Sequence, residues 1–260
     1  MNIRRKGAWF GCAGLLGLAL FAYVYGPALV LYRVTKREVK DDASLARVPE
    51  PVPTNKIAKA AGRAFSFFGV GFQVPWNGEP EVKQWQKVAR IQFPEGQFVM
   101  LFDPSSRADR IRVLGENGRG LQVERVFGRD AMRSNYALVE AVLKVSPKDI
   151  SLWMPRVQLV RNCVFLMLKK AELANTETGL FRFQNQTTRG FQKGDPAKSD
   201  AVAVDVFDND DLEYSIIVGR VKDTKGIVSQ EDINLILATI TAKPVRTQPD
   251  NKSEASSPAD

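Results

Sequence analysis

The residues most able to do chemistry are concentrated between positions 205 and 213. Six side chains with oxygen atoms lie there: Asp205, Asp208, Asn209, Asp210, Asp211 and Glu213. Calcium prefers oxygen ligands, so the five carboxylates of this acidic segment are candidate metal ligands. The EF-hand spacing is absent, because Asp210 stands where its glycine is required and Ile216 where its glutamate is required. Asp and Asn also favour turns, so a solvated hairpin tip is the favoured interpretation.

Arginine is the second concentrated residue type, with seven copies between positions 107 and 133. They are Arg107, Arg110, Arg112, Arg119, Arg125, Arg129 and Arg133. A guanidinium group binds phosphate or carboxylate through two parallel hydrogen bonds, so this segment is a candidate for contact with anionic lipid headgroups. Acidic residues dilute the segment, and alternating strand geometry would divide the arginines between two faces. The chain has no recognised nucleic-acid-binding module, so nucleic acid is not expected as a partner.

The absent residue types restrict the reaction chemistry further. The 260 residues include no histidine and two cysteines, Cys12 and Cys163. Ser–His and Cys–His nucleophile pairs and histidine metal ligands are therefore excluded. Two cysteines cannot build a disulfide framework or a cysteine-rich metal site. Pairs of carboxylates remain open as acid–base groups, because spacing in sequence does not reveal contacts across a sheet. No cofactor is expected.

A membrane segment is expected at residues 8–32, which contain no charge. As a helix it would reach about 37 Å, enough to cross a hydrocarbon core of about 30 Å. Arg4, Arg5 and Lys6 precede it. Its length and bulky end favour an uncleaved single-pass anchor over a signal peptide, with the lipid bilayer as its partner. Small residues at Gly7, Gly11, Ala13 and Gly17 allow a weak homodimer through this helix.

The rest of the chain divides by composition. Residues 1–7 form a short tail, residues 33–55 a basic and proline-rich spacer, residues 56–243 one domain, and residues 244–260 a disordered tail. Basic residues flank both sides of the membrane segment, so the charge comparison leaves its orientation open. We expect the domain on the non-cytoplasmic side of the cell membrane, since a short N-terminal tail usually stays inside.

The domain is expected to be α+β, with a mainly antiparallel sheet covered by helices. Alternating apolar residues predict strands over 68–74, 88–93, 98–102, 180–183, 188–192, 201–207 and 213–221. A bulge is expected near Phe67 and Phe68, and a second hairpin is expected between 111–114 and 121–127, around Asn117-Gly118. Helical spacing predicts helices over 138–145 and 157–168, the latter buried between layers, and a last helix from Ser229.

Two stretches carry a family resemblance. Phe68-Gly-Val-Gly-Phe-Gln-Val-Pro-Trp76 is similar to the first strand of PsbP-like and DcrB-like domains. The closing hairpin through Val218-Gly219, followed by Ser229-Gln-Glu-Asp-Ile-Asn-Leu-Ile-Leu237, resembles theirs as well. Residues 64–242 also resemble uncharacterised membrane-anchored bacterial proteins. The resemblance implies an α–β–α sandwich and an accessory role around membrane complexes, and it transfers no functional residue.

Two functions are consistent with these features. The first is a membrane-anchored, non-enzymatic binding or accessory module that recognises a protein or anionic headgroups. The alternative is a membrane-anchored enzyme that uses carboxylates or a carboxylate-bound metal. The anchor, the spacer and the lack of a recognisable catalytic motif favour the first, and a structure that shows whether acidic residues converge distinguishes them.

Overall fold

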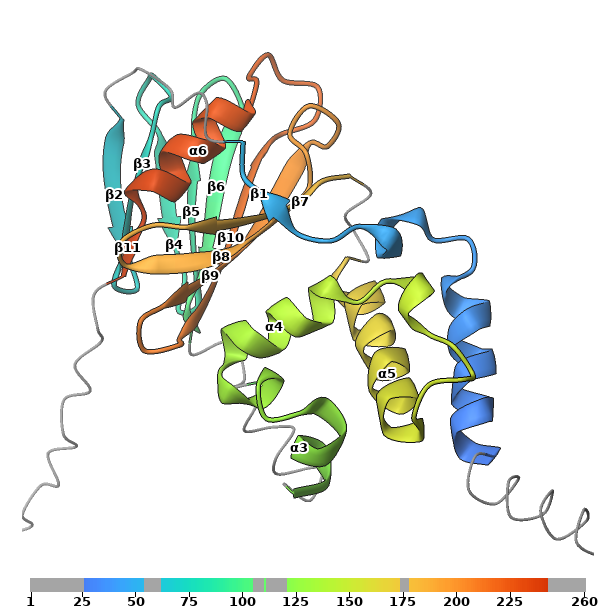
Figure 1. Cartoon of the computed structure of the whole chain (residues 1–260). Helices are drawn as coiled ribbons and strands as arrows, with labels where there is room; N and C mark the ends of the chain where they lie inside the picture. Colours follow the sequence, from blue (N-terminus) through green and yellow to red (C-terminus); the bar gives the residue numbers. More distant parts are fainter. Residues whose placement is uncertain (1–25, 54–61, 105–109, 111–120, 174–177, 243–260) are drawn as a thin grey trace, which may run out of the picture.

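The computed structural model of this chain describes residues 26–53, 62–104, 110, 121–173 and 178–242 (Figure 1). The protein is α+β, with two sheets and a group of helices. Several expected features lie outside the described residues: residues 8–25 of the membrane segment, Asn117-Gly118, and the tail at 244–260. Arg107, Arg112 and Arg119 also lie outside them. Within the described ranges, no helix combines the length and the apolar character that membrane crossing requires.

The larger sheet has eight strands. Their order is β1 (Glu50–Pro51), β7 (Leu180–Gln184), β8 (Thr188–Lys193), β9 (Ala201–Asp208), β10 (Glu213–Arg220), β6 (Gln97–Phe102), β5 (Val88–Gln92) and β4 (Glu81–Gln84). Every neighbouring pair is antiparallel except β1 and β7, which are parallel. The predicted hairpin between 88–93 and 98–102 is confirmed, and Gly96 in its turn has a φ of 102° that favours glycine.

A smaller sheet and the last helix cover one face of the larger sheet (Figure 1). The smaller sheet has the order β11 (Thr241–Ala242), β3 (Val70–Val74) and β2 (Arg63–Phe67), and α6 (Gln230–Thr239) packs beside it. In β3 every second residue is buried, as the alternation predicted. The predicted bulge is wrong. Phe68 and Gly69 both have positive φ and form a tight turn that joins β2 to β3, which reverses the chain instead of bending one strand.

Helices gather on the other side of the larger sheet (Figure 1). They comprise residues 26–39, α3 (Leu121–Phe127), α4 (Asn135–Lys144) and α5 (Arg156–Glu172), with short turns η1 (Ala43–Ala46), η3 (Ala131–Arg133) and η4 (Pro147–Asp149). Leu159 and Leu166 of α5 pack with residues 26–39, whereas Phe165 packs with α3 and α4. This helix therefore has helical neighbours on two sides, although Val157 and Leu168 are exposed.

The strand predicted over 121–127 is wrong, because this segment is α3. Phe127 packs against Phe165 of α5 with ring centroids 5.2 Å apart, and Val123 and Val126 join the same cluster. The spacing of these three residues matches one face of a helix, and the neighbouring helix decides the conformation of so short an apolar run.

The predicted spacer is packed against the domain at several of its described residues. Val39 and Leu45 are buried with residues of α5, and Pro51 pairs in register with Arg182 of β7. Residues 26–32, the end of the predicted membrane segment, also contact α5 through Ala28, Leu31 and Tyr32. Ala28 is the first described residue that is buried in this contact.

Candidate functional site

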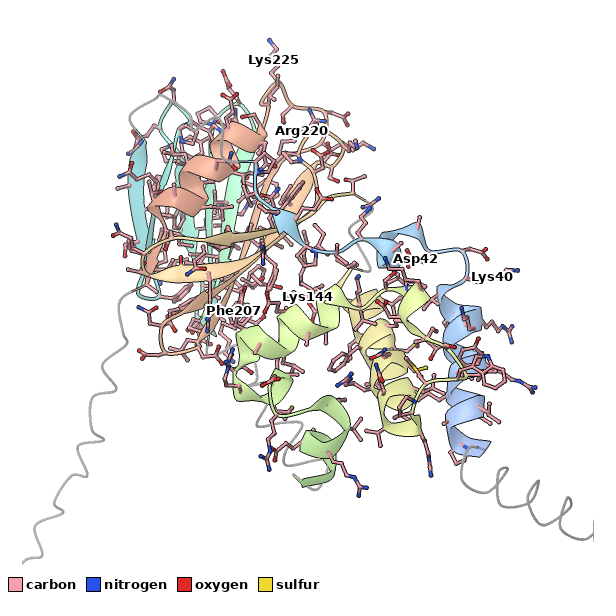
Figure 2. All side chains as sticks on the ribbon, viewed as in Figure 1. Lys40, Asp42, Lys144, Phe207, Arg220 and Lys225 are labelled. Atoms are coloured by element: carbon pink, nitrogen blue, oxygen red, sulfur yellow. The ribbon has the colours of Figure 1, made fainter. Side chains whose placement is uncertain are left out.

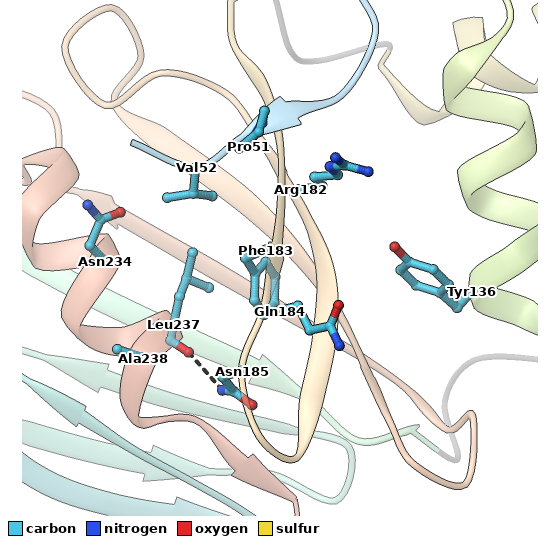
Figure 3. A pocket seen from close by; sticks show the side chains of 10 residues that line it. All are labelled: Pro51, Val52, Tyr136, Arg182, Phe183, Gln184, Asn185, Asn234, Leu237 and Ala238. Carbon is cyan, nitrogen blue, oxygen red and sulfur yellow. Dashed lines mark hydrogen bonds between the residues drawn. The ribbon is translucent and has the colours of Figure 1, made fainter. Parts of the chain in front are cut away.

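A cavity lies where β1, β7, α4 and α6 meet (Figure 3). Its volume is about 540 Å³, within the range of small-molecule sites. Ten residues line it: Pro51, Val52, Tyr136, Arg182, Phe183, Gln184, Asn185, Asn234, Leu237 and Ala238. We call it the β7 cavity. It is assembled from four segments that are distant in sequence, so the sequence alone gave no sign of it.

One wall of the β7 cavity is apolar. Val52, Phe183 and Leu237 are buried and belong to the main hydrophobic core. Phe183 points toward this core because it is the buried member of an alternating strand, whereas Arg182 and Gln184 on either side of it are exposed. The wall can therefore shield the hydrocarbon part of a ligand from water.

Asn185 fixes the lower rim of the cavity. Its side-chain oxygen accepts hydrogen bonds from the backbone N–H groups of Thr187 and Thr188 at 2.9 and 2.8 Å. Its side-chain nitrogen donates to the carbonyl oxygen of Leu237 at 3.0 Å (Figure 3) and to that of Ile240, also at 3.0 Å. Asn185 thereby connects the β7–β8 turn to the end of α6, whose last carbonyls need partners. This side chain has its hydrogen bonds satisfied within the protein and acts as a structural residue.

A second amide network holds the α6 side. Gln230 and Gln192 exchange hydrogen bonds through their side-chain amides at 2.8 and 2.9 Å. Gln230 also donates to the side-chain oxygen of Asn234 at 3.0 Å, and Asn234 donates to the carbonyl of Pro53 at 2.5 Å. These bonds tie the segment after β1 to α6, so the cavity wall around Val52 is held in place by polar contacts as well as by packing.

The opposite side of the cavity presents Tyr136 and Arg182. The ring of Tyr136 is stacked on Phe191 with a centroid distance of 5.2 Å, and the guanidinium of Arg189 lies 4.2 Å from the ring centroid. In Figure 3 the Tyr136 hydroxyl and the Arg182 guanidinium both extend into the space between β7 and α4. Burial and the nearby Glu140 raise the pKa of Tyr136, while Arg189 and Arg182 oppose this effect. The phenol therefore keeps its proton at neutral pH and can donate a hydrogen bond.

This arrangement is suited to binding. Among the described residues that line the β7 cavity there is no carboxylate, thiol or amine to act as a nucleophile or general base. There is instead one guanidinium, one phenol and several amides beside an apolar wall. A guanidinium forms paired hydrogen bonds with carboxylate or phosphate, so the lining matches a small molecule with an anionic group and a hydrocarbon body.

The carboxylates of the acidic segment, which were considered as candidate metal ligands, contact several different partners. Asp205 lies 2.5 Å from the ammonium of Lys193, and Glu213 receives two hydrogen bonds of 2.8 Å from the guanidinium of Arg110. Both carboxylates lie on the sheet face that is covered by helices. Glu172 at the end of α5 links these two ion pairs, because it contacts both Arg110 and Lys193. We call these five residues the buried ion network.

The other three carboxylates of the acidic segment lie at the β9–β10 turn. Asp208 accepts hydrogen bonds from the backbone of Asp210 and Leu212 and from the hydroxyl of Tyr214. Asp211 accepts from the first backbone N–H groups of α4, at Asn135 and at Tyr136, the latter at 3.1 Å. Asp210 is exposed. The structure does not bring the five candidates to one point, and no group of metal-ligating side chains converges in the described part of the chain.

The sequence pattern identified only some of the residues of the buried ion network. Asp205 and Glu213 were singled out, but Glu172, Lys193 and Arg110 were not assigned to them. Of the arginine cluster, Arg110 is used in this network and Arg129 pairs with Glu124 at 3.0 Å. The missed signal is the placement of Lys193 and Asp205 on inward-facing positions of neighbouring strands, because charges at such positions need partners.

Comparisons with known proteins identify no relative: no family model, no curated protein and no solved structure matches this chain.

Proposed function

We propose that this chain is a membrane-anchored binding module and that the β7 cavity binds a small amphipathic anion. The observation that carries the proposal is the lining of the cavity. Arg182 and Tyr136 supply a cationic group and a hydrogen-bond donor, and Val52, Phe183 and Leu237 supply an apolar wall. The ligand would place its carboxylate or phosphate beside Arg182 and its hydrocarbon part along the wall.

The anchor is part of the same proposal. Ala28, Leu31 and Tyr32 pack with residues of α5, so we limit the proposed anchor to residues 8–25. As a helix these would reach about 27 Å, close to the hydrocarbon thickness of about 30 Å. The domain would lie on the non-cytoplasmic side, because a short N-terminal tail usually stays inside. It would serve a membrane complex, as the resemblance to PsbP-like and DcrB-like domains implies. Two copies would associate through Gly7, Gly11, Ala13 and Gly17.

The enzyme alternative has less support from the geometry. It requires carboxylates that are free to bind a metal or move a proton. Asp205 and Glu213 each contact a cation, and Glu172 contacts two. A metal or substrate would have to displace these buried ion pairs before the carboxylates could act.

Ligand binding can be tested by calorimetry with the full-length protein in detergent, using decanoate and decyl phosphate as probes. We expect binding of at least one probe, with affinity reduced about tenfold or more in Arg182→Gln because a charge-assisted hydrogen bond is lost. Arg220→Gln is the matched control, since Arg220 is exposed and pairs with Asp200. Equal affinity of the Arg182 and Arg220 variants, or no binding of either probe by the wild type, contradicts the proposal.

Membrane attachment is tested separately. The full-length protein should remain with membranes after carbonate and high-salt washes, and protease added to spheroplasts should digest the domain. Release by salt would indicate peripheral binding, and protection from protease until lysis would reverse the orientation.

A further inference from the structure

The most exposed large apolar side chain in the described residues is Trp153, with 96% of its surface accessible. It follows Leu152, which is 44% exposed, in the segment between η4 and α5. Tryptophan is usually buried or packed at the edge of a core. Two neighbouring apolar side chains that face solvent therefore indicate a surface that a membrane or another molecule covers.

This segment is packed beside the point where the predicted anchor enters the domain. Ile150 and Met154 lie in the same hydrophobic cluster as Ala28. Residues 26–39 and α5 lie side by side (Figure 1) and run in the same direction, because Glu38 pairs with Lys170 at their C-terminal ends at 2.8 Å. The start of α5 and the segment before it thus lie toward the Gly26 end of the domain.

Further apolar residues are exposed on these two helices. Val30 is 63% exposed, and Val157 in the first turn of α5 is 44% exposed. Exposed arginines accompany them at Arg33, Arg37 and Arg156. Figure 2 shows side chains extending outward from residues 26–39 and from the helices beside them. Apolar side chains with basic neighbours are typical of a surface that rests on anionic headgroups.

We propose that Val30, Leu152, Trp153 and Val157, the Trp153 surface, form a second membrane contact in which Trp153 lies at the bilayer interface. The proposal rests on the proposed anchor, because an anchor ending near Gly26 brings this end of the domain to the lipid surface. Tryptophan is favoured at the interface, where its ring contacts acyl chains and its N–H contacts headgroups. The occupant is a bilayer containing anionic lipid, and the contact would fix the orientation of the domain on the membrane.

The test uses tryptophan fluorescence of the full-length protein in vesicles of phosphatidylcholine and phosphatidylglycerol. The lipids carry bromine near the top of their acyl chains, where it quenches an interfacial tryptophan. The chain has four tryptophans, and Trp9 lies in the predicted anchor, so Trp9→Phe serves as the reference. We expect strong quenching in the reference and loss of most of it when Trp153→Phe is added. Adding Trp85→Phe instead should leave quenching unchanged, since Trp85 is half-exposed on the distant strand edge beside β4.

The outcomes separate this inference from the anchor. Retention on vesicles after a carbonate wash, without quenching of Trp153, would overturn the Trp153 surface and point to a protein partner. Release by carbonate with Trp153 still quenched before the wash would overturn the anchor alone, and release without quenching would overturn both. Thermal unfolding of the Trp153 variant should match that of the reference, because the side chain has almost no contacts to lose.

Discussion

Lys193 joins the sheet to the helices through Glu172: the ammonium at the end of β8 lies 2.5 Å from the carboxylate of the last residue of α5. Lys193 is 5% exposed and also contacts Asp205 at 2.5 Å. A buried ion pair adds little net stability compared with an apolar pair, but loss of one partner leaves a buried charge uncompensated. The contact therefore fixes how α5 sits on the sheet.

Glu172→Gln should lower the free energy of unfolding by about 3 kcal/mol, since Lys193 and Arg110 would each lose a partner. Chemical denaturation of the full-length protein in detergent measures the change. Glu38→Gln is the control, because Glu38 pairs with Lys170 on the exposed surface and its loss should have no measurable effect. Equal stability of the two variants would show that the ion network is dispensable.

The same residue should make stability depend on acid pH. Burial alone raises the pKa of Glu172, but Lys193 and Arg110 more than offset this and lower it to about 2, from an ordinary value of 4.5. An acid with a lowered pKa contributes stability that is complete above 4.5 and is lost as pH falls toward 2. The difference in melting temperature between wild type and Glu172→Gln should therefore shrink over this interval. A difference that stays constant would refute the role of this charge.

Asp211→Ala should destabilise the protein by about 2 kcal/mol. The carboxylate accepts hydrogen bonds from the first N–H groups of α4, which are worth about as much as an N-cap. Asp211 also has a φ of 63°, which alanine adopts at additional cost. Asp211→Asn keeps an acceptor and tolerates this φ, so it should recover much of the loss, and Asp210→Ala at the exposed neighbour should be nearly neutral. If calcium raises the melting temperature of the wild type and not of Asp211→Ala, this residue binds a metal and the capping role is insufficient.

Gly190→Ala should prevent correct pairing of β8 and β9. A Cβ at position 190 would lie 1.9 Å from the backbone oxygen of Asp205, and backbone cannot move aside as a flexible side chain can. We expect a cost above about 4 kcal/mol, seen as loss of the cooperative thermal transition. Gly26→Ala is the matched control. No atom of the described residues lies within 4 Å of its added Cβ, and alanine in a helix should raise stability by up to about 1 kcal/mol. A normal melt for Gly190→Ala would show that this sheet can shift.

Two substitutions in α6 should differ in a fixed order. Ile236 is fully buried in the main core, so Ile236→Ala should cost about 2–5 kcal/mol through lost packing and a cavity. Ser229 caps the helix by accepting a hydrogen bond from the N–H of Asp232 at 3.2 Å, and Ser229→Ala should cost about 1 kcal/mol. Melting temperatures of the two variants check the order, and the reverse order would mean that α6 does not close the core.

Local sequence patterns predicted many of the strands and helices, because these patterns reflect interactions between residues that are close in sequence. Alternation in Val70, Phe72 and Val74 places one face of β3 in the core, and Ser229 with Asp232 forms the predicted capping box. The conformation of Leu121–Phe127 could not be predicted in this way. Its apolar residues fit a strand or a helix, and packing against α5 decides between them. The bulge expected near Phe67 and Phe68 is wrong, because the apolar residues change from odd to even positions there. Such a change is consistent with a turn as well as with a bulge.

The candidate site depends on contacts that sequence order conceals. Arg182 and Tyr136 come from β7 and α4, and the apolar wall adds Val52 and Leu237 from segments much further apart. None of these residues forms a local motif, and their meeting is decided by the order of strands in the sheet. The acidic segment was the opposite case. Its residues are close in sequence, yet alternation along β9 and β10 and the turn between them direct the carboxylates to different partners.

The short strand β1 has a mechanical consequence. Residues 40–53 connect the helix at 26–39 to the sheet, where Glu50 pairs in register with Phe181 and Pro51 with Arg182. Tension along this connection would load those pairs before the longer antiparallel strands, which share more backbone bonds. Pro51 and Val52 also line the β7 cavity, so detachment of β1 under load would remove part of its wall. Loss of the β1 pairing and opening of the cavity wall would then be the same event.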